Sequence, residues 1–182
     1  MQKFKRLALI FFLFNALAGN AQKFTATKGE ITFTSNAVLE LIKASSSKVQ
    51  GVLDSSTEQF AFLVKMQSFE GFNSNLQREH FNEKYMESDK FYDATFTGKL
   101  QEDIDFTKDG TYDVTAKGNL VVHGKKQPRT IPGKITIEKG KVKIDAEFKV
   151  LLADHDIKIP TIVSEKVATE IYIKLVIWMV PK

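Results

Sequence analysis

The sequence predicts an all-β fold, an extended antiparallel β-barrel of about eight strands with one short helix. Apolar and polar side chains alternate along most of the chain after residue 21, which is the pattern of strands that bury one face. Short clusters of turn residues separate these stretches, so consecutive strands are expected to pair as hairpins. A barrel is predicted rather than an open sheet because closure leaves no strand edge exposed.

The first 21 residues are typical of a secretory signal peptide. Basic residues without any acid precede an unbroken apolar run over residues 7–14, and small and polar residues follow over residues 15–21. The apolar stretch from Leu7 to Leu17 is too short to span a bilayer, which takes about 20 apolar residues. We therefore expect the segment to be removed; an uncleaved N-terminal helix is the alternative.

Cleavage is expected near Ala21, because Gly19 and Ala21 supply the small side chains that precede a cleavage site, and Ala16 and Ala18 offer a second site. Residues 22–182 then form one domain, since no repeat or linker divides them. We expect this domain to be periplasmic or secreted.

The composition excludes several kinds of site. The chain has no cysteine, which excludes a disulfide, a thiolate nucleophile and a zinc–thiolate site. Its formal net charge is +4, and removal of the three basic residues in the signal segment leaves +1. A near-neutral domain is not expected to bind nucleic acid, which requires many Lys and Arg side chains against the phosphates.

Alternation is clearest over residues 141–152, where every second side chain from Val142 to Leu152 is apolar and most of the others are charged. A helix would scatter these apolar residues around its axis, so the segment is predicted as a strand. The same pattern predicts strands at residues 31–33, 49–53, 60–66, 94–100, 112–122, 131–137, 141–152 and 167–177. Turn residues lie between them at 54–56, 108–110, 123–126 and 139–140.

Two stretches break this rhythm. Residues 36–45 fit either a short helix or an irregular strand. Residues 74–88 fit a helix with Ser74 as N-cap and Gln77 three residues later, the spacing of a capping box. Four side chains of this helix are expected to face the protein: Leu76, His80, Phe81 and Tyr85.

Two histidines are candidate functional residues. His80 has glutamates at helical spacing, Glu79 and Glu83, which suits a metal or an acid–base pair. The second histidine that a zinc motif requires is replaced by Lys84, so a structural role for His80 is favoured. His123 lies in a predicted hairpin turn and is interpreted as a turn residue with satisfied hydrogen bonds; contact with a ligand or a metal is the alternative.

The segment Asp154-His155-Asp156 has the composition of a metal site, but consecutive strand residues point to alternate faces and do not converge. A solvated loop is expected there. Trp178 is expected either to close the core or to contact a ligand at the barrel mouth. No catalytic residue, metal ligand or cofactor is predicted, and the lack of a Gly-x-Ser-x-Gly motif leaves a hydrolase without a nucleophile elbow.

The inward faces of the predicted strands carry Phe, Val, Ile and Leu and almost no charge, so the contents of the barrel should be apolar. A fully packed interior fits the same alternation equally well. For a hollow barrel, the predicted ligand-binding residues come from the inward phase of five strands: Phe60, Phe62, Phe96, Val114, Phe148, Val150, Ile171 and Ile173.

Three separated motifs carry a resemblance. Residues 72–100 contain His-Phe-Asn-Glu on the predicted helix, then Tyr-Met-Glu-Ser and an aromatic-rich strand. Residues 118–124 have the sequence Gly-Asn-Leu-Val-Val-His-Gly, and residues 148–160 begin with Phe-Lys-Val and end with Ile-Lys-Ile-Pro. In this order the motifs resemble the YceI-like family of polyisoprenoid-binding periplasmic proteins, over essentially the whole expected domain.

The resemblance implies a lipocalin-like barrel that holds a long isoprenoid chain, such as a quinone tail or a polyprenyl lipid, for transport or storage. It implies a binding protein rather than an enzyme, and transient contact with a membrane. The alternatives are a structural or stress-related barrel with a packed interior and no ligand, and a hydrolase. The sequence does not indicate an oligomeric state.

Overall fold

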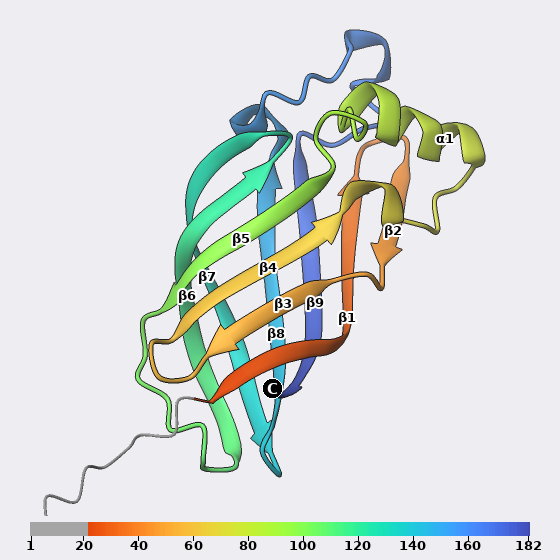
Figure 1. Ribbon diagram of the computed structural model, residues 1–182. Helices are drawn as coiled ribbons and strands as arrows, with labels where there is room; N and C mark the ends of the chain where they lie inside the picture. The colour runs from red at the N-terminus through yellow and green to blue at the C-terminus, as the bar shows by residue number, and fades with distance from the viewer. Residues whose placement is uncertain (1–21) are drawn as a thin grey trace, which may run out of the picture.

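The computed structural model describes residues 22–182, so the expected signal peptide lies outside the described residues. Its strands form one antiparallel sheet (Figure 1). They are β1 (Lys23–Asn36), β2 (Leu41–Ser46), β3 (Gln50–Asp54), β4 (Gln59–Lys65), β5 (Asp93–Leu100), β6 (Gly110–Val122), β7 (Lys125–Glu138), β8 (Lys141–Leu151) and β9 (Glu170–Pro181). No helix among the described residues is long and apolar enough to cross a membrane.

The sheet closes into a barrel because β1 pairs with strands on both of its edges. One edge pairs with β9 over residues 24–34. The other edge pairs with β3 over residues 23–25 and then with β2 over residues 31–36, so β2 and β3 share one position in the wall. The prediction of a closed antiparallel barrel of about eight strands with one short helix is confirmed. The ambiguous segment 36–45 contains most of β2.

Short helical segments lie in the connections: η1 (Met66–Ser68), α1 (Asn75–His80), η2 (Phe81–Tyr85), η3 (Leu152–His155) and η4 (Thr161–Val163). α1 continues directly into η2, which is π-helical, so the helix is shorter than the predicted 74–88. Ser74 is its N-cap as predicted, and its Oγ accepts a hydrogen bond from the Gln77 N–H at 3.1 Å. The capping box is incomplete, because the Gln77 Oε1 accepts from the Asn73 N–H at 3.0 Å instead of that of Ser74.

The inward face of this helix differs from the prediction. Phe81 and Tyr85 face the barrel interior, as expected. Leu76 and His80 are exposed, so the prediction that they face the protein is wrong. The cause is the position of α1, which lies at one end of the barrel and projects beyond its wall (Figure 1). The π-helical half supplies the aromatic side chains Phe81 and Tyr85 to the interior, and α1 itself contributes only Gln77.

Tight hairpins join the strands from β6 to β8. The turn residues His123 and Gly124 have φ values of 50° and 69°, and Lys139 and Gly140 have 50° and 71°. Positive φ at both central positions is characteristic of a type I′ turn, whose twist matches that of the flanking strands. The predicted turns at 123–126 and 139–140 therefore contain two-residue hairpin turns.

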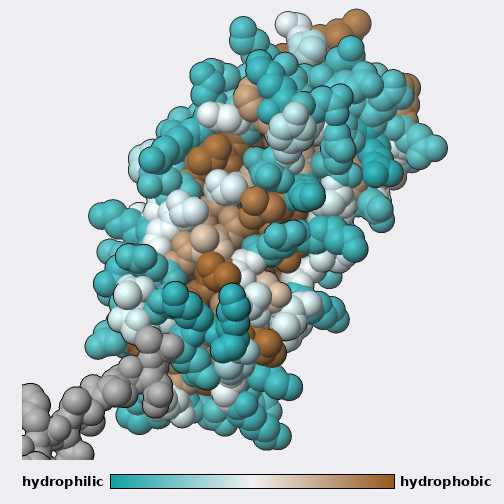
Figure 2. Space-filling view, in the orientation of Figure 1, coloured by the Kyte–Doolittle hydropathy of each residue, from teal (hydrophilic) through white to brown (hydrophobic). Residues whose placement is uncertain are grey.

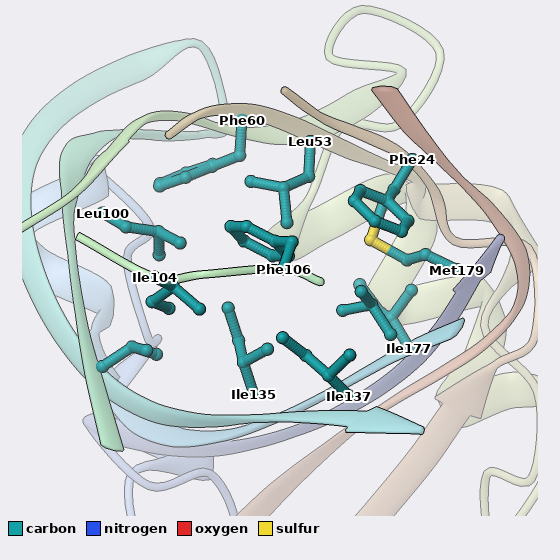
Figure 3. Close-up of a cluster of buried hydrophobic side chains, with 12 residues drawn as sticks. Phe24, Leu53, Phe60, Leu100, Ile104, Phe106, Ile135, Ile137, Ile177 and Met179 are labelled. Atoms are coloured by element: carbon teal, nitrogen blue, oxygen red, sulfur yellow. The ribbon is translucent and has the colours of Figure 1, made fainter. Parts of the chain in front are cut away.

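The loop between β5 and β6, residues 101–109, fills one end of the barrel. It buries Ile104 and Phe106 in the barrel interior, where they lie among side chains from the surrounding strands (Figure 3). The Phe106 ring packs against Phe24, with the ring centroids 5.5 Å apart. We call this set the plug cluster and the end it fills the plug end; its buried members are Phe24, Leu53, Phe60, Leu100, Ile104, Phe106, Val114, Ile135, Ile137, Val142, Ile177 and Met179.

β5 and β6 approach each other closely where Gly98 pairs with Gly118. A Cβ on Gly98 would lie 2.2 Å from the carbonyl oxygen of Lys117, and a Cβ on Gly118 would lie 2.2 Å from that of Thr97. Any side chain at either position would push the strands apart. The two glycines therefore permit the close approach of the two strands at this part of the wall.

The opposite end of the barrel, where α1 and η2 lie, is the helix end (Figure 1). A second apolar cluster lies there, and we call it the helix-end cluster. Its buried members are Phe33, Ile42, Ala44, Val64, Met66, Phe69, Met86 and Ile157. Unlike the plug cluster, it draws many of its side chains from connecting segments, because the strands alone do not close this end.

Candidate ligand-binding site

The helix end of the barrel contains a cavity of about 160 Å³. Strands on all sides contribute to its wall, and η2 and the loop between η3 and β9 cover it. Apart from Ser35 and Gln77, its lining residues are apolar or aromatic. An apolar cavity of this kind is a poor site for water and a good one for a hydrocarbon.

Four phenylalanine rings pack together over this cavity. Phe33 stacks on Phe81 with the ring centroids 5.3 Å apart, and Phe72 lies 5.1 Å from Phe81. Phe69 lies 5.5 Å from Phe33. Three of the four rings come from the segment between β4 and the end of η2, so this connection provides an aromatic cover for the cavity.

A smaller cavity of about 50 Å³ lies between the larger cavity and the plug cluster. Phe148 on β8 lines both cavities. Its side chain is half-buried and belongs to neither apolar cluster. The Phe148 ring therefore lies between the two cavities, and it is less buried than the residues of either cluster.

The structure places all eight predicted ligand-binding residues inside the barrel, next to a cavity. Val150, Ile171 and Ile173 line the larger cavity with Phe148. The others line the smaller cavity, again with Phe148: Phe60, Phe62, Phe96 and Val114. Phe60 and Val114 are also members of the plug cluster, so the predicted set is divided between a hollow region and a packed one. Their contact with a ligand stays a prediction.

Sequence reasoning missed the residues that cover the larger cavity. Phe69, Phe72 and Met86 line it but lie outside the strands, so a period of two does not identify them. Ile157 lies in the loop after η3 and was missed for the same reason. The available signal was the high density of aromatic residues beside the predicted helix, which is unusual for a solvent-exposed connection.

Two of the polar side chains that line the larger cavity, Gln77 and Ser35, are hydrogen-bonded within the protein. The Gln77 Nε2 donates to the Glu40 Oε1 at 2.9 Å, and the Ser35 Oγ accepts from the Ala168 N–H at 2.9 Å. Burial raises the pKa of the Tyr85 hydroxyl, which stays protonated and neutral. None of the described lining residues carries a carboxylate, a basic group or an imidazole. The cavity thus offers binding surface and no acid–base pair.

His123 makes hydrogen bonds at both ring nitrogens. Its Nε2 lies 2.7 Å from the Glu87 carboxylate, and its Nδ1 lies 3.0 Å from the carbonyl oxygen of His155. Because a carbonyl only accepts, Nδ1 carries the proton. The Phe91 ring packs edge-on against the imidazole, with the centroids 4.4 Å apart. This agrees with the interpretation of His123 as a satisfied turn residue.

The segment 154–156 is not the solvated loop that was expected. His155 is completely buried, and its Nδ1 donates to the carbonyl oxygens of Val122 and Lys125 at 3.2 and 3.1 Å. The two aspartates form ion pairs with other residues, Asp154 with Arg129 at 2.9 Å and Asp156 with Lys125 at 2.5 Å. The expectation was wrong because the contacts that bury His155 come from the β6–β7 turn, far away in the sequence. Burial lowers the pKa of His155 and favours the neutral imidazole.

Trp178 occupies neither of its two expected places. It lies on the outer face of β9, is 38% exposed, and has the ammonium groups of Lys28 and Lys143 5.2 and 5.8 Å from its ring. Such cation–π contacts stabilise an exposed indole on the barrel wall. Within residues 22–182, no three His, Asp or Glu side chains gather as a metal site would require, and His80 is exposed.

Comparisons with solved structures agree with this architecture. A polyisoprenoid binding domain from Saccharophagus degradans superposes with a TM-score of 0.71 at 12% identity, covering 87% of this chain and 98% of that one. BcnA from Burkholderia cenocepacia gives a TM-score of 0.67 at 15% identity over 82% of this chain and 95% of that one. A YceI protein from Campylobacter jejuni gives 0.55 at 16% identity over 100% of this chain and 91% of that one. At these identities the likeness shows the fold.

A comparison with family models assigns the sequence itself. No curated protein matches the chain. The model of the YceI-like domain matches residues 18–178, which is nearly the whole described region. The barrel, its apolar cavity and this match agree, and the chain belongs to the YceI-like family.

Proposed function

We propose that this chain is an exported binding protein that holds a long isoprenoid, or a related amphiphilic lipid, in its barrel for transport or storage. The observation that carries the proposal is the apolar cavity at one end of a closed barrel. The structural neighbour described as a polyisoprenoid binding domain supports the choice of ligand class. Cleavage near Ala21 would release the domain into the periplasm or the medium.

The chemistry of the cavity favours binding over catalysis. An enzyme site requires polar groups that converge on a reacting atom, whereas Gln77 and Ser35, which line this cavity, are hydrogen-bonded to other parts of the protein. A hydrolase would also need an activated nucleophile. Ser35 does not fit this role, because its Oγ accepts a hydrogen bond from a backbone N–H. The protein is therefore proposed to be a carrier and not an enzyme.

A long chain requires the interior to expand. A cavity of about 150 Å³ accommodates a molecule the size of benzene, and the larger cavity here is about 160 Å³. An isoprenoid of several units therefore needs the space on both sides of Phe148 and displacement of the aromatic cover. Phe148, Phe72 and Phe81 are suited to this, because they are half-buried and lie outside the plug cluster.

The affinity should come from many weak contacts. Burying one isoprene unit gains about 4 kcal/mol gross, at about 0.8 kcal/mol for each of its carbons. A chain of about eight units would then exceed the limit of about 20 kcal/mol that non-covalent complexes reach. Ordering the chain and removing it from a membrane must offset most of this gain. A carrier that both loads and releases its lipid is the result, with no single residue as anchor.

The direct test is organic extraction of the protein purified from its host, followed by mass spectrometry. We expect a polyprenyl lipid, a quinone or another long-chain amphiphile in a stoichiometric amount. The purified apoprotein should also take up a polyprenol supplied in detergent. If neither natural nor supplied isoprenoid is retained by the folded protein, the proposal is wrong and the barrel is a structural one.

A matched pair of variants tests whether the cavity is the site. Phe148→Asp places a charge between the two cavities and should abolish lipid retention, because a buried unpaired carboxylate is strongly disfavoured beside a hydrocarbon. Lys143→Asp changes the charge on the outer face of the same strand and should leave retention unchanged. Phe62→Asp and a charge change at Glu147 repeat the comparison at other positions. Retention by folded Phe148→Asp would place the ligand elsewhere.

A further inference from the structure

Apolar side chains project into solvent at the helix end of the barrel. Val38 is 87% exposed, Leu39 63%, Leu76 58% and Ile162 91%. Figure 2 shows hydrophobic side chains standing out at this end among hydrophilic ones. Single exposed apolar residues are ordinary on protein surfaces, but several at one end of the barrel are not accounted for by folding, because most of their surface stays exposed in the described structure.

These tips surround the covered end of the larger cavity. Val38 and Leu39 lie in the turn between β1 and β2, and both strands contribute side chains to the cavity. Ile162 lies in the loop between η3 and β9, and Ile157 and Val167 on either side of it line the cavity. Each loop therefore connects the interior of the barrel to an exposed apolar tip.

The two loops form one unit. The Leu39 N–H donates to the Glu165 carbonyl oxygen at 2.8 Å, across the gap between the loops. The Ala168 N–H donates to the Ser35 Oγ at 2.9 Å, just below the tips. The apolar side chains are thus presented together on a hydrogen-bonded platform and are not scattered over independent loops.

The described turns and loop at the plug end carry no such exposed apolar tips. Its turns are polar, with Asp54, Ser55 and Ser56 after β3 and Lys139 and Gly140 after β7. Among the described residues of these turns and of the loop 101–109, no large hydrophobic side chain is exposed. The asymmetry matches that of the interior, since the cavity and the apolar tips lie at the same end.

We propose that the helix end docks on a lipid bilayer, with Val38, Leu39 and Ile162 entering the boundary between headgroups and acyl chains. The inference rests on the proposed function, because an isoprenoid resides in a bilayer and must leave it to reach the cavity. Lys158 and Lys166 are exposed, lie four residues before and after Ile162, and suit the phosphate headgroups around an inserted side chain.

A bilayer fits these tips better than a folded partner does. A protein interface buries a continuous apolar core that excludes water. Here the exposed apolar side chains share one platform, but charged residues such as Glu40 and Lys166 adjoin them in the sequence. A small apolar platform with charged neighbours suits a surface in which apolar and polar layers lie a few ångströms apart. Docking would let a lipid pass from bilayer to cavity without crossing water.

The test is sedimentation of the protein with sucrose-loaded vesicles of phosphatidylcholine, with and without phosphatidylglycerol. We expect the wild type to bind, more strongly with the anionic lipid, and the double variant V38D/I162D to partition about tenfold less or weaker still. Val52→Asp is the matched control, since Val52 is 49% exposed on the outer wall at β3, away from the tips. It should bind vesicles like the wild type.

Lipid uptake separates this inference from the proposed function. V38D/I162D should retain a polyprenol supplied in detergent as the wild type does, yet take it up more slowly from vesicles. A wild type that retains the polyprenol but does not bind vesicles, or a V38D/I162D protein that binds them normally, would overturn the docking surface alone. Failure of the wild type to retain any isoprenoid would instead overturn the proposed function.

Discussion

The two ends of the barrel have walls of the same kind and different contents. At the plug end, a loop sends Ile104 and Phe106 into the barrel interior, and the strand side chains close around them. At the helix end, the connecting segments stop at the rim, and a cavity of about 160 Å³ remains below them. The comparison shows that inward apolar strand residues line a space without determining whether that space is filled. The segments that connect the strands at each end determine whether the space is filled.

The difference also separates stability from function. The plug cluster contains most of the side chains that are completely buried, including Leu53, Ile135, Ile177 and Met179. The helix-end cluster is built partly from helical turns and loops, which open at lower free energy than packed strands. We therefore expect the plug end to keep the barrel folded while the helix end rearranges around a ligand.

The largest effect is expected from emptying the plug. Phe106→Ala should lower the free energy of unfolding by about 3–5 kcal/mol, because it leaves a cavity inside the plug cluster. Phe72→Ala removes a half-buried ring at the helix end and should have a distinctly smaller effect. Urea unfolding followed by circular dichroism measures both. Equal losses would show that the two ends are equally important for stability, and the comparison would be wrong.

Removing the Phe148 ring should change which lipid is retained more than it changes the stability of the fold. Phe148→Ala joins the two cavities and is expected to lower the free energy of unfolding by less than about 3 kcal/mol, because the ring already borders empty space. The variant should select longer chains from a mixture of polyprenols, as measured by mass spectrometry of the retained lipid. Val150→Ala enlarges only the larger cavity and serves as the control. An unchanged length distribution for Phe148→Ala would remove Phe148 from the path of the chain.

A smaller and local effect is expected at the helix N-terminus. Ser74→Ala removes the hydrogen bond to the Gln77 N–H and should destabilise the helix by about 1 kcal/mol. Hydrogen exchange should become faster over residues 75–85, while the melting temperature of the barrel hardly changes. Ser74→Asp keeps a capping oxygen and should restore slow exchange. A general loss of protection would mean that the helix end does not open independently.

The smallest effect concerns pH. Burial lowers the pKa of His155 below its ordinary value of 6.5, so the unfolded chain binds a proton that the folded one excludes. The neutral imidazole therefore favours folding above about pH 6.5, and this contribution is lost as the pH falls below that value. The melting temperature should be higher at about pH 7.5 than at about pH 5, and His155→Gln should reduce the difference.

Asp105 does not contribute to this difference. Its pKa is lowered to about 2 by its hydrogen bond with Thr107, so its carboxylate stays charged throughout this range.

The sequence predicts the wall of this barrel well, for a physical reason. Each strand buries one face, so alternation along residues 141–152 identifies both the strand and its inward side chains, Phe148 and Val150 among them. The segment matching β2 was ambiguous because it is only six residues long. Its pairing with β1, and not its own pattern, makes it a strand.

The contents of the barrel could not be predicted in the same way. Ile104 and Phe106 lie in a loop without regular spacing, and only the closed barrel shows that the loop turns inward. His155 lies between two aspartates in the sequence, which predicts an exposed residue. In the structure it is buried against the carbonyl groups of a turn that is distant in the sequence. Burial of this kind depends on contacts between segments far apart in the chain, which local periodicity does not contain.

β2 and β3 share one position in the barrel wall, and this arrangement affects how the protein could associate with itself. β2 pairs with β1 alone, so its outer edge presents backbone N–H and C=O groups to which a strand of a second molecule could add. Reciprocal hydrogen bonds between Ser45 and Glu70, both 2.8 Å, occupy part of that edge. The exposed Lys43 places a charge on the remainder. The Ser45–Glu70 bonds and the Lys43 charge therefore protect the edge of β2 from pairing with a second molecule, even when the helix end opens for a ligand.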